Sequence, residues 1–396
     1  MSALADRSAG AAERSGRALR FVWFVHSLRS DWNHGNAHFL RGVIFELGRR
    51  GHEADVYEPE GAWSLAQLLE EHGPAAVKAF ESAYPGLHSR TYRLEGIDLD
   101  RVLDGADVVI VHEWNDPALL RRLGDARRRM PSLRLFFHDT HHRAVTKPEE
   151  IGQLDLSEFD GVLAFGRILS DHYRDRGWTR AAWTWHEAAD PRVFRPHPGV
   201  ERSEDLVWIG NWGDGERARE LSEYLLGPAR ALGLRATVYG VRYPDEARRA
   251  LDEAGIRYRG WLPNFEAPAV FARHKATVHV PRWPYARALP GIPTIRVFEA
   301  LACGIPLVCA PWEDAEGLFT PHRDYEVARS GARMRERLRE LIHEPERGAA
   351  LAEHGLATIR SRHTCAHRVD ELLSIVRETS GTPGRATAAA DAEARA

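Results

Sequence analysis

The chain has 396 residues, of which 43% are hydrophobic and 28% are charged, and its formal net charge is −3. This length suits two domains of about 150–200 residues each, and the near-neutral charge argues against nucleic acid or an anionic membrane as a partner. The three cysteines, Cys303, Cys309 and Cys365, are too few and too scattered for a disulfide framework or a CxxC zinc site. We therefore expect a two-domain protein of the reducing cytoplasm.

The two ends of the chain differ in composition from the rest. Residues 1–18 and 380–396 are rich in small and charged residues, so we expect disordered tails. The first segment lacks the apolar core of a signal peptide. No stretch of about 18 apolar residues occurs, so we expect no membrane span.

The first half of the chain alternates short apolar runs with helical patterns. Strands are predicted at 19–25, 53–57, 106–111, 133–137, 161–165 and 181–185. Helices are predicted at 39–47, at 65–84 with a break at Gly73-Pro74, at 117–129, and after the fifth strand as far as Tyr173. Such βα units imply a parallel sheet, which we assign to an N-terminal domain at 19–190.

A linker follows, and the alternation then restarts. Residues 190–199 contain three prolines and a glycine, which exclude both a helix and a central strand. Strands are then predicted at 206–210, 236–239, 276–280 and 306–310, and helices at 217–232, 245–254, 294–302, 333–343, 346–354 and 365–379. The sequence thus predicts an α/β protein with two Rossmann-like domains facing across a cleft, the second at 191–364.

Ligands of open α/β sheets bind beyond the carboxyl ends of the strands, so polar residues after strands are site candidates. The loop Gly210 to Gly215 follows the first strand of the second domain, and its glycines allow close backbone approach to a phosphate. The alternative is an ordinary tight turn. Its spacing is not the GxGxxG dinucleotide fingerprint, which disfavours a dehydrogenase. The residues assigned here are Gly210, Asn211, Trp212, Gly213 and Arg217.

A second candidate is the start of the helix at 294–302. Free amides there, together with Arg296 and the nearby Arg282, are suited to a diphosphate. One turn later, Glu299 is expected beside the buried stripe of the helix, where a carboxylate can accept hydrogen bonds from two ribose hydroxyls. The alternative is a solvated glutamate on the helix surface.

Four segments carry a resemblance to a known family. Residues 298–308 (FEALACGIPLV) resemble the donor-site helix of glycosyltransferases with the GT-B fold. Residues 208–212 (WIGNW), 260–264 (GWLPN) and 186–196 (HEAADPRVFRP) are similar to the family's glycine loop, nucleobase turn and entry to the second domain. The chain resembles in particular the CgeB-like group of spore maturation proteins, related to family 4, over about residues 19–378.

The resemblance implies roles for individual residues. It implies that Glu299 binds the donor ribose, that Thr294, Ile295 and Arg296 help hold the diphosphate, and that the backbone of Trp261 and Leu262 contacts the base. It also implies that the helix at 365–379 crosses back onto the first domain. One position departs from the pattern, because Gly291 stands where retaining family-4 enzymes have a second glutamate. The stereochemical outcome and the donor sugar therefore stay open.

The N-terminal domain offers the catalytic and acceptor candidates. They follow the first, third and fourth strands, and are Asp31, His34, Gly35, Asn36, His112, Glu113, Trp114, Asp139 and His141. Histidine titrates near neutrality and burial can tune a carboxylate, so His141, Asp139, His112 and Asp31 are candidate bases, with His141 favoured. A metal bound by Asp139, His141 and His142 is disfavoured, because adjacent histidines point in different directions and GT-B enzymes generally use no catalytic metal.

The sequence therefore predicts transfer of a sugar from a nucleotide diphosphate sugar to a small-molecule, glycan or protein acceptor, without a cofactor. Two alternatives stay open. A nucleotide-sugar epimerase of the same shape would convert the donor without an acceptor. A catalytically silent scaffold, which Gly291 keeps possible, would bind the donor without turnover.

Overall fold

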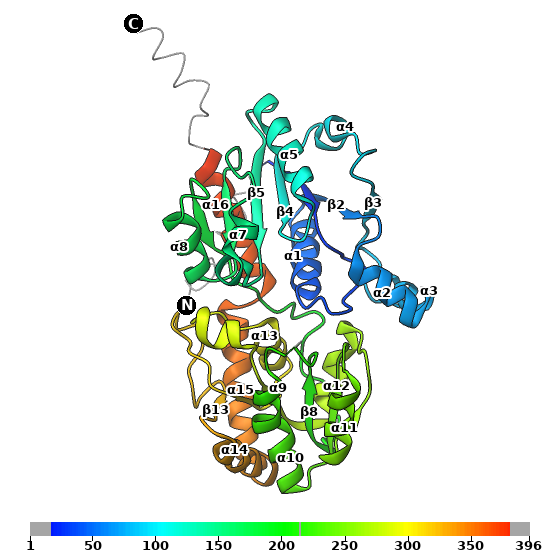
Figure 1. Ribbon diagram of the computed structural model, residues 1–396, viewed down its shortest axis with the longest axis vertical. Helices are drawn as coiled ribbons and strands as arrows, with labels where there is room; N and C mark the ends of the chain where they lie inside the picture. The colour runs from blue at the N-terminus through cyan, green and yellow to red at the C-terminus, as the bar shows by residue number, and fades with distance from the viewer. Residues whose placement is uncertain (1–16, 214, 381–396) are drawn as a thin grey trace, which may run out of the picture.

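The computed structural model describes residues 17–213 and 215–380. The predicted tails fall largely outside these residues, as does Asp214 of the predicted glycine loop. Within the described part, the chain forms two lobes, each built on a parallel sheet (Figure 1). The predicted fold class, two Rossmann-like α/β domains, is confirmed.

The N-terminal sheet has seven parallel strands in the order β3-β2-β1-β4-β5-β6-β7. Its strands are β1 (Arg20–Phe24), β2 (Glu53–Pro59), β3 (Arg90–Tyr92), β4 (Val108–His112), β5 (Arg134–Asp139), β6 (Gly161–Ala164) and β7 (Ala182–Thr184). Its helices are α1 (Ala37–Arg49), α2 (Trp63–His72), α3 (Pro74–Ala83), α4 (Leu99–Leu103), α5 (Pro117–Arg129), α6 (Arg143–Thr146), α7 (Pro148–Ile151) and α8 (Arg167–Asp175).

The C-terminal sheet has six parallel strands in the order β10-β9-β8-β11-β12-β13. They are β8 (Glu204–Ile209), β9 (Ala236–Tyr239), β10 (Arg257–Tyr258), β11 (His274–His279), β12 (Leu307–Cys309) and β13 (Glu326–Val327). The helical segments are α9 (Ala218–Leu221), η1 (Ser222–Leu226), α10 (Gly227–Leu232), α11 (Asp245–Glu253), η2 (Asn264–Glu266), α12 (Ala267–Ala272), η3 (Pro284–Ala288), α13 (Ile295–Ala302), α14 (Gly331–His343), α15 (Pro345–Arg362) and α16 (Cys365–Ser380).

Side-chain alternation along β1 explains how the first sheet is buried on both faces. Phe21 and Trp23 point into one apolar cluster, whereas Val22 and Phe24 point into another on the opposite face. The first cluster also contains Phe298 from the second lobe, so apolar packing continues from one lobe into the other.

The last helix returns to the first lobe. In Figure 1, α16 lies in the upper lobe with α1 and β5, whereas α15 lies in the lower lobe. The Trp185 indole donates a hydrogen bond to the Arg368 carbonyl at 2.8 Å, and the Arg50 guanidinium donates to the Ala366 carbonyl at 2.9 Å. No helix within the described residues is long and apolar enough to cross a membrane.

The order of the strands positions the site. In both sheets the chain reverses its direction of winding between the first strand and a central neighbour, β1 beside β4 and β8 beside β11. A crevice forms beyond the carboxyl ends of strands at such a switch point. The two switch points face each other across the gap between the lobes, so the loops after these four strands can share one cavity.

Candidate functional site

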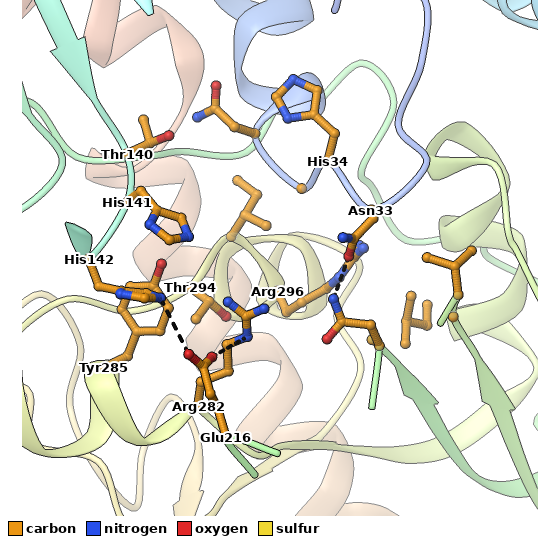
Figure 2. Close-up of a pocket in the computed structure, with 18 of the residues that line it drawn as sticks. Asn33, His34, Thr140, His141, His142, Glu216, Arg282, Tyr285, Thr294 and Arg296 are labelled. Atoms are coloured by element: carbon orange, nitrogen blue, oxygen red, sulfur yellow. Dashed lines mark hydrogen bonds and ion pairs between the residues drawn. The ribbon is translucent and has the colours of Figure 1, made fainter. Parts of the chain in front are cut away.

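A cavity of about 660 Å³ lies between the lobes and is lined by residues of both. Figure 2 shows His141 and His142 on the N-terminal side, facing Arg282 and Glu216, with Thr294 next to Arg282 and Arg296 extending toward Asn33. The predicted residues that line the cavity are Asp31, His34, Gly35, Asn36, Trp114, His141, Gly210, Asn211, Arg217, Trp261, Leu262, Arg282, Thr294, Ile295 and Arg296.

Six predicted residues are not among those lining the cavity, namely His112, Glu113, Asp139, Trp212, Gly213 and Glu299. Three of them form the floor beneath the N-terminal loops. The Asp139 carboxylate is fully buried and accepts hydrogen bonds from the Tyr173 hydroxyl at 2.8 Å and the His141 amide at 2.9 Å. Burial, together with the nearby Glu113, raises the pKa of Asp139 to about 7. Asp139 therefore fixes the loop that presents His141 and does not itself line the cavity.

His112 and Glu113 are likewise bound to each other beneath the loop. The Nε2 atom of His112 lies 3.0 Å from a carboxylate oxygen of Glu113, and the Thr140 hydroxyl donates to the other oxygen at 3.0 Å. Burial disfavours the ionised form of Glu113, but the adjacent His112 outweighs burial and lowers the pKa of Glu113 below its ordinary value. This pair orients Thr140, which does line the cavity.

Arg217 is the least compensated charge on the cavity wall. Its guanidinium donates to the backbone oxygens of Asn211 at 2.7 Å and Val280 at 3.0 Å, and to the Asn211 side chain at 2.7 Å. Its Nε is buried without a hydrogen-bond partner, and no carboxylate among the described residues forms an ion pair with it. Burial, with Arg282 nearby, lowers the pKa of Arg217 to about 10, so it stays charged at neutral pH.

The glycine loop leaves space for the Arg217 side chain. Gly213 has φ +93°, and a Cβ there would lie 2.7 Å from the Arg217 Cγ. The absence of a side chain at 213 therefore lets Arg217 fold back across the loop toward the cavity. Trp212 turns away from the cavity and packs beside Tyr243, with a ring-centroid distance of 5.8 Å. Trp212 and Gly213 thus do not line the cavity, and their contact with a donor stays a prediction.

Two more arginines reach the cavity from different elements. Arg282 follows β11 and pairs with Glu216 at 3.1 Å, and Glu216 also lies 4.0 Å from Nε2 of His142 (Figure 2). Arg296 lies in the first turn of α13 and forms an ion pair with Glu299. Thr294, the N-cap of α13, makes no side-chain capping bond. The first amides of the helix therefore lie beside three guanidinium groups.

Glu299 is fully buried, which differs from the expected position beside the buried stripe. The Asp190 amide donates to Nε2 of His38 at 2.9 Å, so the His38 proton is on Nδ1, which donates to Glu299 at 3.1 Å. The Asn264 side chain donates to the same carboxylate at 3.1 Å. Burial opposes ionisation, but Arg296 and these hydrogen bonds outweigh it and lower the pKa of Glu299. The carboxylate thus joins the lobes and holds Arg296 from behind the cavity wall.

Asp31 lines the cavity, but its carboxylate is already engaged. It forms an ion pair with the buried Arg41 at 2.8 Å and accepts hydrogen bonds from the Trp261 indole at 3.0 Å and the Asn264 amide at 3.2 Å. Asp31 therefore links the second lobe to the first, and its carboxylate already has partners in both lobes. Gly35 also allows the two lobes to approach each other, because a Cβ at this position would lie 3.1 Å from Ile295 of the second lobe.

His141 remains the candidate base that faces the cavity. Its ring packs edge-on against Trp114 at 5.1 Å and lies 4.0 Å from the His142 ring. Burial, together with the neighbouring His142, lowers the pKa of His141 to about 3, and burial lowers that of His142 to about 4. Both rings are therefore neutral near pH 7, and the same burial makes each a weaker base than an ordinary imidazole.

The opposite end of the cavity is suited to a flat ring. Trp261 and Leu262 line it next to the loop after β9, where Gly240, Val241 and Arg242 also contribute. Gly240 has φ +157°, and a Cβ there would lie 2.0 Å from the Gly210 carbonyl oxygen, so these two loops touch through backbone. The two loops therefore lie too close together for a side chain at position 240.

Sequence reasoning missed several residues that line the cavity. They include Trp63, Thr140, His142, Arg143, Glu187, Glu216 and Tyr285. His142, Thr140 and Glu216 adjoin predicted residues, so the position after a strand was an available signal. Glu187 follows β7 by three residues and lies in the segment 186–196 quoted for the resemblance, so the same signal was available for it. Among the described residues, no group of three or more His, Cys, Asp or Glu is arranged to hold a metal ion.

The structure also explains why position 291 holds a glycine and not the glutamate that the resemblance leads us to expect. The φ of Gly291 is +93°, and a Cβ there would lie 2.9 Å from the Glu316 Cγ. Glu316 in turn binds the Arg167 amide at 2.8 Å and His186 at 3.0 Å, both in the first lobe. A longer side chain at 291 is therefore excluded by a contact that joins the lobes.

Comparisons with known proteins agree with this architecture. A family profile described as "Glycosyl transferase-like" matches residues 217–374. A comparison with curated proteins gives no match. A glycosyltransferase structure from Rickettsia africae is similar with a TM-score of 0.63 at 10% identity, covering 93% of this chain and 100% of that one.

Two further structures contain ligands. HepE from Anabaena, in complex with UDP and glucose, has a TM-score of 0.61 at 14% identity, covering 91% of this chain and 100% of its own. An alpha-glucosyltransferase in complex with UDP and a 13-mer DNA has a TM-score of 0.65 at 11% identity, with coverage of 91% and 100%. The chain therefore has the GT-B fold of glycosyltransferases, and its C-terminal half includes a glycosyltransferase-like domain.

Proposed function

We propose that this chain transfers a sugar from a nucleoside diphosphate sugar to an acceptor bound in the cleft between its lobes. The observation that carries the proposal is Arg217, a charged guanidinium on the cavity wall that has carbonyl partners but no carboxylate partner among the described residues. A guanidinium charge that is partly removed from water is costly unless an anion compensates it. A diphosphate is such an anion.

The surroundings of Arg217 favour a phosphate over a single carboxylate. Arg282 and Arg296 line the same cavity, and the first amides of α13 add hydrogen-bond donors at the positive end of a helix dipole. These groups would stabilise the leaving diphosphate as charge develops on it, without a resident metal. The Trp261–Leu262 slot would take the base. We assign residues 191–364 to the donor domain and 19–190 to the acceptor domain.

The resemblance assigns the donor ribose to Glu299, and we keep this role as part of the proposal. Because His38 and Asn264 bind the Glu299 carboxylate, ribose binding requires these hydrogen bonds to be exchanged. His141 is the proposed base toward the acceptor. Membership of the CgeB-like group is likewise proposed, and the stereochemical outcome is left open by Gly291.

Calorimetry with nucleotide sugars in excess EDTA tests this function. We expect the wild-type chain to bind at least one of UDP-glucose, GDP-mannose, ADP-glucose and dTDP-glucose without a divalent metal. Arg217→Ala is expected to weaken that affinity about 10- to 100-fold, because a charge-assisted hydrogen bond contributes about 1.5–3 kcal/mol. Glu299→Gln is expected to weaken it by about tenfold.

The control is Arg219→Ala, an exposed arginine on the same helix that does not line the cavity. It should leave the affinity within about twofold of the wild type. Binding of no nucleotide sugar by the folded wild-type chain would refute the proposal. Binding that requires a divalent metal would refute the metal-free part alone. Conversion of the bound donor without an acceptor would instead identify an epimerase.

A further inference from the structure

Glu187 places a buried carboxyl group on the cavity wall at the junction of the lobes. It lies between β7 and the linker, lines the cavity, and is only 6% exposed. Its Oε1 accepts a hydrogen bond from the Asn36 side chain at 3.1 Å, and Asn36 comes from the loop after β1. No described residue forms a hydrogen bond with Oε2, so that atom is available to a ligand in the cavity.

The charges around Glu187 keep it neutral. Burial, aided by the carboxylates of Glu299 and Glu113, raises its pKa to about 8, although the Asn36 hydrogen bond and Arg296 act in the opposite direction. Near pH 7 the group is therefore mostly a carboxylic acid. In this form it can donate one hydrogen bond and accept another, and it does not repel a diphosphate held by the neighbouring arginines.

The position of Glu187 relative to those arginines narrows the choice of ligand group. The cations that suit a diphosphate, Arg217, Arg282 and Arg296, lie along the C-terminal wall, and the flat slot at Trp261 lies at another end of the cavity. Glu187 and Asn36 line the same cavity from the N-terminal lobe, and Arg296 is near enough to act on the pKa of Glu187, so a group attached to a diphosphate on these arginines can reach the carboxyl group. A paired acid and amide at that place match adjacent hydroxyl groups.

We propose that Glu187 is a specificity residue that hydrogen-bonds hydroxyl groups of the transferred sugar through its Oε2 atom, with Asn36 holding the carboxyl group in place. The class of sugar it fits is a neutral sugar with free hydroxyls. This inference rests on the proposed function, because it requires that the cavity take a nucleoside diphosphate sugar.

Paired calorimetry separates the sugar from the rest of the donor. The affinities of a nucleoside diphosphate and of its sugar ester, for example UDP and UDP-glucose, are measured for the wild type, Glu187→Ala and Glu187→Gln. The pair used is the one that the wild type binds best among UDP, GDP, ADP and dTDP with their sugars. Glu149→Gln, an exposed glutamate of the same lobe outside the cavity, is the matched control.

We expect Glu187→Ala to weaken binding of the sugar ester about tenfold while binding of the nucleoside diphosphate stays within about twofold. Glu187→Gln should show a smaller loss, because an amide can replace one hydrogen bond, and Glu149→Gln should show none. Retained binding of the nucleoside diphosphate also reports that each variant is folded. If Glu187→Ala does not fold, Glu187→Gln serves for the same comparison.

Equal losses for the two ligands, or no loss for either, would overturn the role of Glu187 and leave the proposed function intact. Equal affinity of the wild type for both ligands would also overturn it, because the sugar would then make no net favourable contact. Failure of the wild type to bind any of the pairs would instead refute the proposed function, and the role of Glu187 with it.

Discussion

Arg217 and Glu187 both place an ionisable group on a cavity wall where little water reaches it. Burial lowers the pKa of Arg217 to about 10, which leaves the guanidinium charged at neutral pH. Burial raises the pKa of Glu187 to about 8, which leaves most of its carboxyl groups protonated. Burial thus disfavours both charged forms, but it removes the charge at neutral pH only from Glu187, because the ordinary pKa of arginine lies far above 7. The cavity wall around them stays suited to a negatively charged ligand.

The raised pKa of Glu187 predicts a pH-dependent difference in stability. A carboxyl group whose pKa rises from 4.5 in the unfolded chain to about 8 binds more protons in the folded chain between these values. Its contribution to the free energy of unfolding therefore falls as pH rises through this window, by at most about 1.4 kcal/mol per pH unit. The groups that face it are Asn36, Arg296, Glu299, Glu113 and Tyr285.

Glu187→Gln removes this titration without removing the shape. We expect its melting temperature, relative to the wild type, to increase from pH 5 to pH 8 and to level off above that. The measurement is differential scanning fluorimetry across this range, with the exposed Glu149→Gln as the control, whose difference from the wild type should be constant. A constant difference for Glu187→Gln would show that the carboxyl group titrates near its ordinary value.

The same residues show which parts of the site the sequence could predict. His141 could be predicted because it follows a strand, where the sheet topology gathers polar groups, and Arg296 because it lies at the start of a predicted helix. The burial of Glu299 could not, because its partner His38 is 261 residues away in the chain. When a carboxylate is buried by a segment that is distant in the chain, the sequence around it contains no pattern that predicts the burial. The burial of Glu187 could not be predicted for a related reason, because its environment is created only when the lobes meet.

At the scale of elements, runs of apolar residues predicted the central strands of each sheet. β4 is buried throughout and β1 and β5 are buried after their first residue, and all three stand out as apolar runs. The edge strands β3, β10 and β13 have only two or three residues, too few for a periodic signal. The expected helix at 217–232 is divided by a π-helical turn at Ser222–Leu226. This turn directly precedes α10, in which Pro228 has no amide hydrogen to donate.

The loop before α9 gives a prediction about how an element positions a side chain. Gly213→Ala introduces a Cβ 2.7 Å from the Arg217 Cγ and also strains the backbone at φ +93°. We expect it to displace Arg217 and to weaken nucleotide-sugar binding about as much as Arg217→Ala does. The measurement is the affinity by calorimetry, together with the melting temperature of each variant.

The control for backbone strain is Gly255→Ala in the same lobe. Gly255 has φ +71°, and a Cβ there meets no atom within 4 Å. Gly255→Ala should lower the free energy of unfolding by about 1–2 kcal/mol and leave the affinity for the nucleotide sugar unchanged, because backbone strain is its only effect. If Gly213→Ala lost stability without loss of affinity, Gly213 would be needed for the turn and not for the position of Arg217.

At the scale of the whole molecule, the C-terminal helix belongs to the lobe that contains the N-terminal strands. Its buried face, which includes Val369 and Leu372, packs in the same apolar cluster as Phe39 of α1 and Trp185. The chain therefore crosses between the lobes twice, once at the linker and once before α16. Two crossings restrict the ways in which the lobes can move, because each lobe must carry both connections.

This arrangement predicts which helices lose stability when a substitution creates a cavity in α16. Leu372→Ala should lower the free energy of unfolding by about 2–5 kcal/mol, since Leu372 is fully buried. Hydrogen exchange should show the loss of protection in α1 and α16 of the first lobe, with α14 unchanged. Leu338→Ala is the matched control, because it empties an equally buried site in α14 of the second lobe and should affect α10 and α14. If Leu372→Ala instead lowered protection equally in α1 and α14, the two lobes would unfold as one cooperative unit, and the stabilising effect of α16 would not be confined to the first lobe.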